Sequence, residues 1–409
     1  MPVTRIVDDT KKKLKKPWFY AENGFDLTFF LLVLILLVVG LVCMFSASYV
    51  YAYYWDDDSY YYIKRQLIFA LIGVVAMIAI SFVDYHKLHK FAFPAMIASW
   101  ALLVVALVTP SSTGVHRWIR LGSLTFQPSE VAKFAVVLVF AHMISLNYKK
   151  MKKFTVGFLP FILLLGGTCA LVFIEPHLSG TVLILGIGLV MMYVGGTRQV
   201  YLLGLIGIGV AVVLYMVFGM GYEADRIFVW QDPLAAYKVD KDAAWQTVQS
   251  LYAIGSGGVL GQGLGNSRQK HLFLPEPQND FVFSIVCEEL GLVGAVLIIL
   301  LFAALLWRGF TLAMKAPDKF GMMLVIGLTA QVGIQTVLNM AVVTNLIPNT
   351  GISLPFFSYG GTSLVMLLAQ MGVILSVTRQ MALPATGRKR DKERAESESP
   401  PAGRQPSGG

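Results

Sequence analysis

Long apolar runs alternate with short polar segments along most of this chain. A run of about 20 apolar residues is long enough to cross the hydrocarbon core of a bilayer as a helix. The pattern therefore predicts an all-α integral membrane protein with ten transmembrane helices. The predicted spans are 27–46, 66–83, 91–109, 130–147, 155–174, 180–195, 199–220, 281–307, 320–344 and 361–379.

The segments outside these spans differ in composition. A basic segment, 1–26, precedes the ten-helix membrane domain, 27–380, and a tail, 381–409, follows it. The tail is rich in charged residues, Ser, Pro and Gly, so it is predicted to be disordered. The large extracytoplasmic loop, 221–280, connects the seventh and eighth predicted helices. Its Trp and Tyr residues suit contact with the bilayer or a cavity, and its length favours a functional loop.

The positions of Lys and Arg predict the orientation in the membrane. Basic residues cluster before the first predicted span and after the second, fourth, sixth, eighth and tenth. Basic connections remain on the cytoplasmic side, so both termini are predicted to be cytoplasmic. The predicted outer segments are then about 47–65, 110–129, 175–179, 221–280 and 345–360.

Composition agrees with a membrane protein, because the 409 residues are 56% hydrophobic and only 14% charged. A net charge of +9 would also suit a nucleic-acid-binding protein. Most basic residues, however, lie in the predicted cytoplasmic segments, where topology and anionic lipid explain them, so no nucleic-acid partner is predicted. Cys43, Cys169 and Cys287 fall within predicted spans, and no disulfide framework is predicted.

Asp280 is the leading candidate for chemistry, because it lies where the eighth predicted span meets water. An ionisable group is expensive to hold at a membrane boundary, although a capping role in the first helical turn is the alternative. Ser284 and Glu288 follow at four-residue steps, which predicts one shared helix face. With Glu289 beside Glu288, this face suits general base chemistry on a phosphate-bearing lipid.

Two more predicted outer segments carry polar groups. Glu130 and Lys133 are three residues apart and share a helix face, so an internal ion pair is one explanation for them. A cation just inside a membrane helix is also expected to face a cavity or an anionic ligand. In the short link 175–181, turn chemistry is favoured over a ligand role for His177.

Glycine and proline mark two irregular segments. The glycines of 255–265 match no dinucleotide-binding fingerprint, but they allow close approach of the backbone to a ligand or another element. Arg268 and Lys270, shortly before Asp280, are candidates for binding phosphate, with a solvated basic pair as the alternative. The segment 348–363 is rich in Pro and Gly, which predicts an irregular backbone that lines a cleft.

Several motifs in order resemble one family. They are WQTVQSLYAIGSGG at 245–258, LPEPQNDFVF at 274–283, EELG at 288–291 and PFFSYGG at 355–361. Supporting matches are FSAS at 45–48, Arg117, QPSE at 127–130 and Lys133. Over about residues 25 to 380 the chain resembles the SEDS family of shape, elongation, division and sporulation, and within it most resembles the FtsW and SpoVE branches.

The resemblance implies a glycosyltransferase of the bacterial inner membrane that polymerises lipid II into peptidoglycan glycan strands on the outer face, releasing undecaprenyl diphosphate. Asp280 matches the essential aspartate of the family, which would take a proton from the acceptor hydroxyl or orient it. The implied substrate-binding residues are Arg117, Lys133, Gln249, Ser250, Arg268, Lys270, Glu276 and Ser358, with Glu130, Glu288 and Glu289 in support. His177 and Asn279 depart from the Asp and Thr that are usual in the family.

The resemblance also implies partners. These are a class B penicillin-binding protein, which is a transpeptidase, and other divisome proteins in the division branch. No cofactor is established by the sequence, and a divalent cation that helps to hold the diphosphate is left open. Two other classes of function are considered: a lipid II flippase, and a divisome scaffold without chemistry. The polar groups cluster on one predicted face of the membrane, which favours an enzyme.

Overall fold

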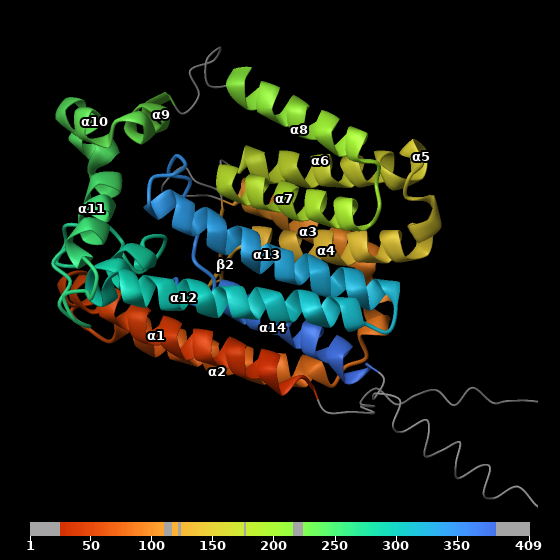
Figure 1. Ribbon diagram of the computed structural model, residues 1–409, viewed down its shortest axis with the longest axis horizontal. Coiled ribbons are helices and arrows are strands. Elements are labelled where there is room, and N and C mark those ends of the chain that lie inside the picture. The colour runs from red at the N-terminus through yellow and green to blue at the C-terminus, as the bar shows by residue number, and fades with distance from the viewer. Residues whose placement is uncertain (1–24, 110–116, 122–123, 176, 216–223, 382–409) are drawn as a thin grey trace, which may run out of the picture.

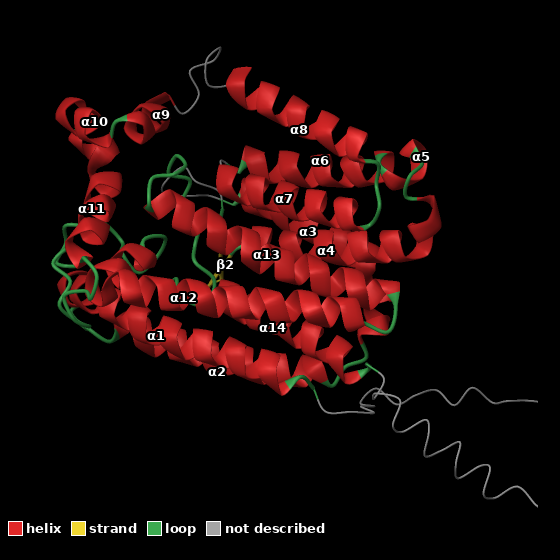
Figure 2. Cartoon of the chain, viewed as in Figure 1, coloured by secondary structure: helices red, strands yellow, loops and turns green. Residues whose placement is uncertain are grey.

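The computed structural model describes residues 25–109, 117–121, 124–175, 177–215 and 224–381, and these residues are mainly helical (Figures 1 and 2). The helices of the first half are α1 (Leu27–Asp56), α2 (Tyr61–Ser81), α3 (Leu88–Val108), α4 (Pro128–Asn147), α5 (Phe154–Gly157), α6 (Leu159–Ile174), α7 (Leu178–Val194) and α8 (Gln199–Leu214). The later helices are α9 (Ala224–Gln231), α10 (Pro233–Val239), α11 (Lys241–Gly257), α12 (Val282–Lys315), α13 (Lys319–Val343) and α14 (Gly361–Arg379). Short 3₁₀ turns η1 (Tyr85–Lys87) and η2 (Tyr148–Lys150) and a hairpin of β1 (Ile119–Leu121) and β2 (Leu124–Phe126) complete the described elements.

The prediction of a multi-pass helical membrane protein is confirmed. Among the described residues, eight helices are long and apolar enough to cross a membrane. The shorter apolar helices α7 and α8 occupy two more of the predicted spans. The long helices run side by side as one bundle (Figure 1). The count of ten spans, and the position of the large loop after the seventh, stay predictions.

Some helices differ from their predicted bounds for local chemical reasons. Helix α1 continues past the predicted end at residue 46 to Asp56 through a sequence rich in Tyr and Trp, residues that favour the membrane interface. The predicted span 155–174 is divided at Phe158, just before Pro160, whose ring suits a helix start but not an interior. Helix α12 contains a break at Gly291, where φ is 65° and ψ is −166°.

Small residues allow close packing between helices and of helix α1 against the segment 345–360. A Cβ at Gly40 of α1 would lie 2.4 Å from the backbone oxygen of Phe356, so only glycine permits this approach. A Cβ at Gly372 of α14 would lie 2.6 Å from the backbone oxygen of Met77 in α2. Small residues at helix contacts are the usual way in which membrane helices pack closely. The irregular segment is therefore pressed onto the bundle.

The non-membrane elements gather at one end of the bundle. Helices α9, α10 and α11 and the loop before α12 lie at this end (Figure 1). Helix α11 packs against α12, and Ser250 Oγ donates a 2.8 Å hydrogen bond to the backbone oxygen of Val343. The first and last described residues lie near each other, because the backbone N–H of Asp26 donates to Thr378 Oγ1 at 3.1 Å. The side of the membrane that each end faces stays a prediction.

Candidate functional site

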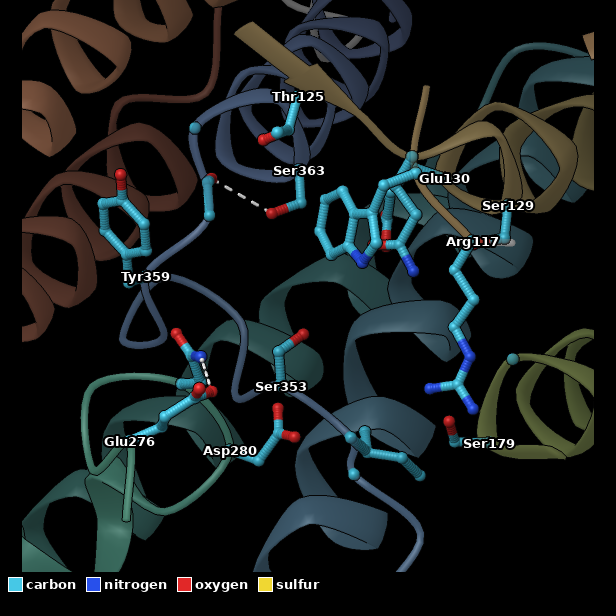
Figure 3. A pocket seen from close by; sticks show the side chains of 18 of the residues that line it. Arg117, Thr125, Ser129, Glu130, Ser179, Glu276, Asp280, Ser353, Tyr359 and Ser363 are labelled. Carbon is cyan, nitrogen blue, oxygen red and sulfur yellow. Dashed lines mark hydrogen bonds between the residues drawn. The ribbon is translucent and has the colours of Figure 1, made fainter. Parts of the chain in front are cut away.

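A cavity of about 960 Å³ lies among residues from α1, α2, α4, α7 and α13 and from the loops before α12 and α14. Volumes of about 300 to 1,000 Å³ are typical of ligand sites. Its polar lining includes Asp56, Arg65, Arg117, Gln127, Ser129, Glu130, Lys133, His177, Ser179, Glu276, Asn279, Asp280, Gln335, Ser353 and Ser363. Figure 3 shows many of these side chains around the cavity.

Asp280 lines this cavity and does not cap a helix. Helix α12 begins at Val282 with Phe281 as its N-cap residue, and no side chain caps it among the described residues. A Cβ at Gly351 would lie 3.1 Å from Asp280 Oδ2, so a glycine leaves room for the carboxylate. Gly351 has a φ of 65°, which also favours glycine. The alternative of a capping role is therefore not supported.

Asn339 of α13 holds the backbone on both sides of this contact. Its Nδ2 donates to the backbone oxygen of Asp280 at 2.7 Å and to that of Ile352 at 2.6 Å. Asn339 is fully buried, so neither bond competes with bulk water. One side chain thus fixes the loop before α12 against the loop before α14. The motifs read from the sequence did not include this residue.

Burial and, to a smaller extent, the nearby Glu276 carboxylate raise the pKa of Asp280 to about 6, against the opposing effect of Arg117. A carboxylate with this pKa is mostly ionised at neutral pH yet is a better proton acceptor than an ordinary aspartate. Glu276 also lines the cavity and accepts a 2.8 Å hydrogen bond from Asn279 Nδ2. The two predicted acids at the end of this loop therefore share one site.

Lys133 both pairs with Glu130 and lines the cavity. Lys133 Nζ lies 2.8 Å from Glu130 and donates to Gln335 Oε1 at 3.3 Å. The side chain of Lys133 is only 5% exposed. The two explanations that the sequence left open for Lys133, an internal ion pair and a cavity cation, are thus compatible. Arg117 reaches the cavity from the segment before β1.

Arg268 and Lys270 do not stand beside Asp280 as the sequence suggested. Arg268 is exposed, and neither residue lines the cavity in the part of the chain that the structure describes. Lys270 is fully buried, with its Nζ 2.6 Å from Glu289 Oε1 and 4.8 Å from the centre of the Tyr49 ring. Its charge is therefore neutralised within the protein and is not presented to a ligand.

Glu288 and Glu289 likewise anchor a loop instead of sharing a face with Asp280. Glu288 accepts hydrogen bonds from the Ser267 hydroxyl and from the backbone N–H of Arg268 at 2.9 Å. A face shared by Asp280, Ser284 and Glu288 requires the helix to include Asp280, but α12 begins two residues later, at Val282. Four-residue spacing therefore does not place these carboxylates in the cavity.

Three other predicted substrate-binding residues lie outside the cavity lining in the described structure. Ser250 Oγ lies 2.7 Å from Ser284 Oγ, which ties α11 to α12. Gln249 is buried next to it. Ser358 Oγ accepts a 2.7 Å hydrogen bond from the backbone N–H of Leu354 and so closes a turn. These contacts shape the protein around the site.

The structure adds cavity residues to which the sequence assigned no ligand role. Arg65 of α2 lines the cavity, and its guanidinium lies 4.1 Å from the centre of the Tyr61 ring. Ser129 and Ser179 also line it, as does His177, for which a turn role was favoured. An arginine near the start of an apolar helix is the only sequence signal among these, because a serine or a turn histidine is common at such positions.

The described residues do not form a metal centre, because no group of three or more His, Cys, Asp or Glu side chains among them is arranged to hold a metal ion. The fold and the cavity define a multi-pass helical membrane protein. Its cavity holds a carboxylate of raised pKa, Asp280, together with cationic side chains.

Comparison with known proteins gives the family. The model of cell cycle proteins that covers FtsW, RodA and SpoVE matches residues 26–383. Stage V sporulation protein E of Bacillus subtilis (strain 168) is 40% identical over 361 residues, which cover 87% of this chain and 97% of that protein. A probable peptidoglycan glycosyltransferase FtsW of Geobacter sp. (strain M18) is 37% identical over 362 residues, covering 88% and 98%. The chain belongs to the FtsW, RodA and SpoVE family, as the motifs predict.

Solved structures show the same fold. A chain from a peptidoglycan synthase complex that coordinates polymerization and crosslinking aligns with a TM-score of 0.72 and 27% identity, covering 88% of this chain and 99% of that one. The rod shape determining protein RodA of Thermus thermophilus aligns with a TM-score of 0.65 and 27% identity, covering 88% and 98%.

Proposed function

We propose that this protein is a peptidoglycan glycosyltransferase that polymerises lipid II into glycan strands. The observation that carries the proposal is Asp280, a carboxylate of raised pKa in a cavity that also holds Arg117 and Lys133. The relatives named as glycosyltransferases and the solved synthase complex support the same activity.

In the proposed reaction, Asp280 accepts the proton of the acceptor sugar's 4-hydroxyl as that oxygen attacks the anomeric carbon of the donor. The new glycosidic bond forms as the bond between this carbon and the diphosphate oxygen breaks, with inversion at the carbon. The electron pair leaves with the polyprenyl diphosphate, and nearby cations stabilise the charge that develops on it. General base catalysis of this kind typically contributes about 10² to 10⁴ in rate.

We place the cavity at the outer face of the bacterial plasma membrane, with both termini in the cytoplasm. The basic connections between the predicted spans support this orientation. A class B penicillin-binding protein is the proposed partner, and divisome proteins are proposed partners in division. The similarity to a chain of a peptidoglycan synthase complex supports the first of these.

The activity is tested by reconstituting the purified protein with its partner transpeptidase and lipid II, and comparing wild type with Asp280→Asn. Wild type is expected to form glycan strands and Asp280→Asn none, because an amide cannot accept the proton. Asp242→Asn is the matched control, since Asp242 is exposed on α11 outside the cavity lining. Absence of strands with wild type while lipid II still crosses the membrane would favour a flippase. Strands from Asp280→Asn at the wild-type rate would exclude Asp280 as the base.

A further inference from the structure

The first turn of α7 opens into the cavity. Ser179 and Gly180, the second and third residues of this 17-residue helix, both line it. The first amides of an α-helix have no acceptor within the helix. His177 occupies the N-cap position without a side-chain capping bond, among the residues described. The positive end of this helix dipole therefore lies at the wall of the cavity.

Two buried hydroxyls in the cavity wall have no hydrogen-bond partner among the described residues. Ser179 is 3% exposed and Ser129, from the first turn of α4, is 1% exposed, and the Oγ atom of each lacks a hydrogen bond. Buried polar atoms are nearly always bonded, so such exceptions require an explanation. Both serines line the cavity, where a bound group can accept hydrogen bonds from their hydroxyls.

The charge at this corner is positive. The guanidinium of Arg117 points toward Ser179 (Figure 3). Burial raises the pKa of Glu175 to about 8 despite the attraction of Arg117, so this carboxyl is mostly protonated at neutral pH. Burial, aided by Arg117 and Lys133, lowers the pKa of His177 to about 3, so the imidazole is neutral. A second cation of the cavity, Lys133, pairs with Glu130.

We propose that Arg117, Ser129, Ser179 and the amides of the first turn of α7 form a binding site for the diphosphate of the lipid-linked donor. Helix N-termini with nearby cations are well suited to phosphate groups. The donor's diphosphate is bonded to the anomeric carbon that the hydroxyl at Asp280 attacks, so it must occupy the same cavity. The diphosphate of the acceptor lies a whole disaccharide away from that hydroxyl. This inference rests on the proposed function and gives the leaving group a location that Arg268 and Lys270 do not provide.

The site is tested by binding of farnesyl diphosphate to the full chain, purified in a detergent without phosphate. Inorganic diphosphate is expected to compete with it and farnesol is not. Ser179→Asp is expected to weaken binding at least tenfold, because a second anion occupies the site, while an acid in the first turn favours the helix and preserves its thermal stability. Ser129→Ala combined with Ser179→Ala removes both hydroxyls without adding charge, and a several-fold loss is expected.

Ser363→Asp is the matched control. Ser363 lies in the first turn of α14 and lines the same cavity, but its hydroxyl already donates to the Gly360 backbone oxygen at 3.0 Å. A much smaller loss is expected there than in Ser179→Asp. Equal losses in the two acidic variants, unchanged affinity in Ser179→Asp, or equal competition by farnesol would each overturn the site. Binding is read without turnover, so wild type that binds farnesyl diphosphate at this corner yet makes no strands would refute the activity alone.

Discussion

Replacement of Lys270 by Met separates a structural role from a ligand-binding role. Lys270 and Glu289 are both buried, at 0% and 2% exposure, and their charged atoms lie 2.6 Å apart. Removing one partner of a buried ion pair typically costs about 3–5 kcal/mol, because the other charge remains unpaired. Glu289 would still accept hydrogen bonds from the Ser46 hydroxyl and from the Ser267 backbone N–H at 3.4 Å. We therefore expect a loss at the lower end, about 3 kcal/mol.

The assay is unfolding of the purified protein in mixed micelles, with the double variant Lys270→Met and Glu289→Gln as the control. The double variant removes both charges and is expected to recover most of the free energy of unfolding that the single variant loses. Farnesyl diphosphate affinity of the folded single variant should stay close to that of wild type, because Lys270 Nζ faces Glu289 and not the cavity. Normal stability with strongly weakened diphosphate binding would refute this reasoning and restore Lys270 as a phosphate ligand.

Three further changes probe the site. Asn339→Ala is expected to lower the polymerisation rate by at least tenfold. It leaves the backbone oxygens of Asp280 and Ile352 buried without their donor, which costs about 1–3 kcal/mol for each oxygen. A wild-type rate would show that the two hydrogen bonds of Asn339 are dispensable. The polymerisation rate should fall as the pH drops through about 6, where Asp280 takes up a proton. Glu276→Gln should move this fall to lower pH, because it removes a carboxylate that raises the pKa of Asp280. A pH profile that Glu276→Gln leaves unchanged would contradict this coupling. Gly351→Ala should reduce the polymerisation rate more than a Gly→Ala change on the lipid-facing surface. The φ of 65° at Gly351 disfavours a side chain, and the new Cβ would lie 3.1 Å from Asp280 Oδ2. Full activity with normal folding would show that the Asp280 carboxylate does not need the space that Gly351 leaves.

The membrane helices could be predicted from the sequence because apolar length is a property of each segment alone. Asp280 and Glu276 could be placed together for a similar reason, since they are neighbours in one loop. The roles of Glu288 and Lys270 could not. Their partners depend on where α12 begins and on how the preceding loop turns back over it, and neither follows from helical spacing.

Asn339 shows a second limit of the sequence. In sequence it is a polar residue in a predicted span, where hydrogen bonding to any neighbouring helix would be expected. Its actual partners are backbone oxygens of two loops, one of which lies 59 positions away along the chain. Ser129 and Ser179 could not be identified from the sequence either. What distinguishes them is a buried hydroxyl without a hydrogen-bond partner among the described residues, and only the packed structure shows this.

Helix α13 fixes the spacing between groups of the site, because two of its side chains hold residues on either side of the cavity. Gln335 binds Lys133 Nζ at 3.3 Å and donates to the Ser353 backbone oxygen at 3.0 Å, while Asn339, one turn further along, holds the backbone of Asp280. Four residues of α-helix span about 6 Å, and a packed helix does not stretch. The separation between the proton acceptor and the cation of α4 is thus set by the pitch of a helix instead of by the loops that carry the reacting groups. Loops of different length can therefore be accommodated around an unchanged reaction geometry, whereas one residue added between these two amides would put it out of register.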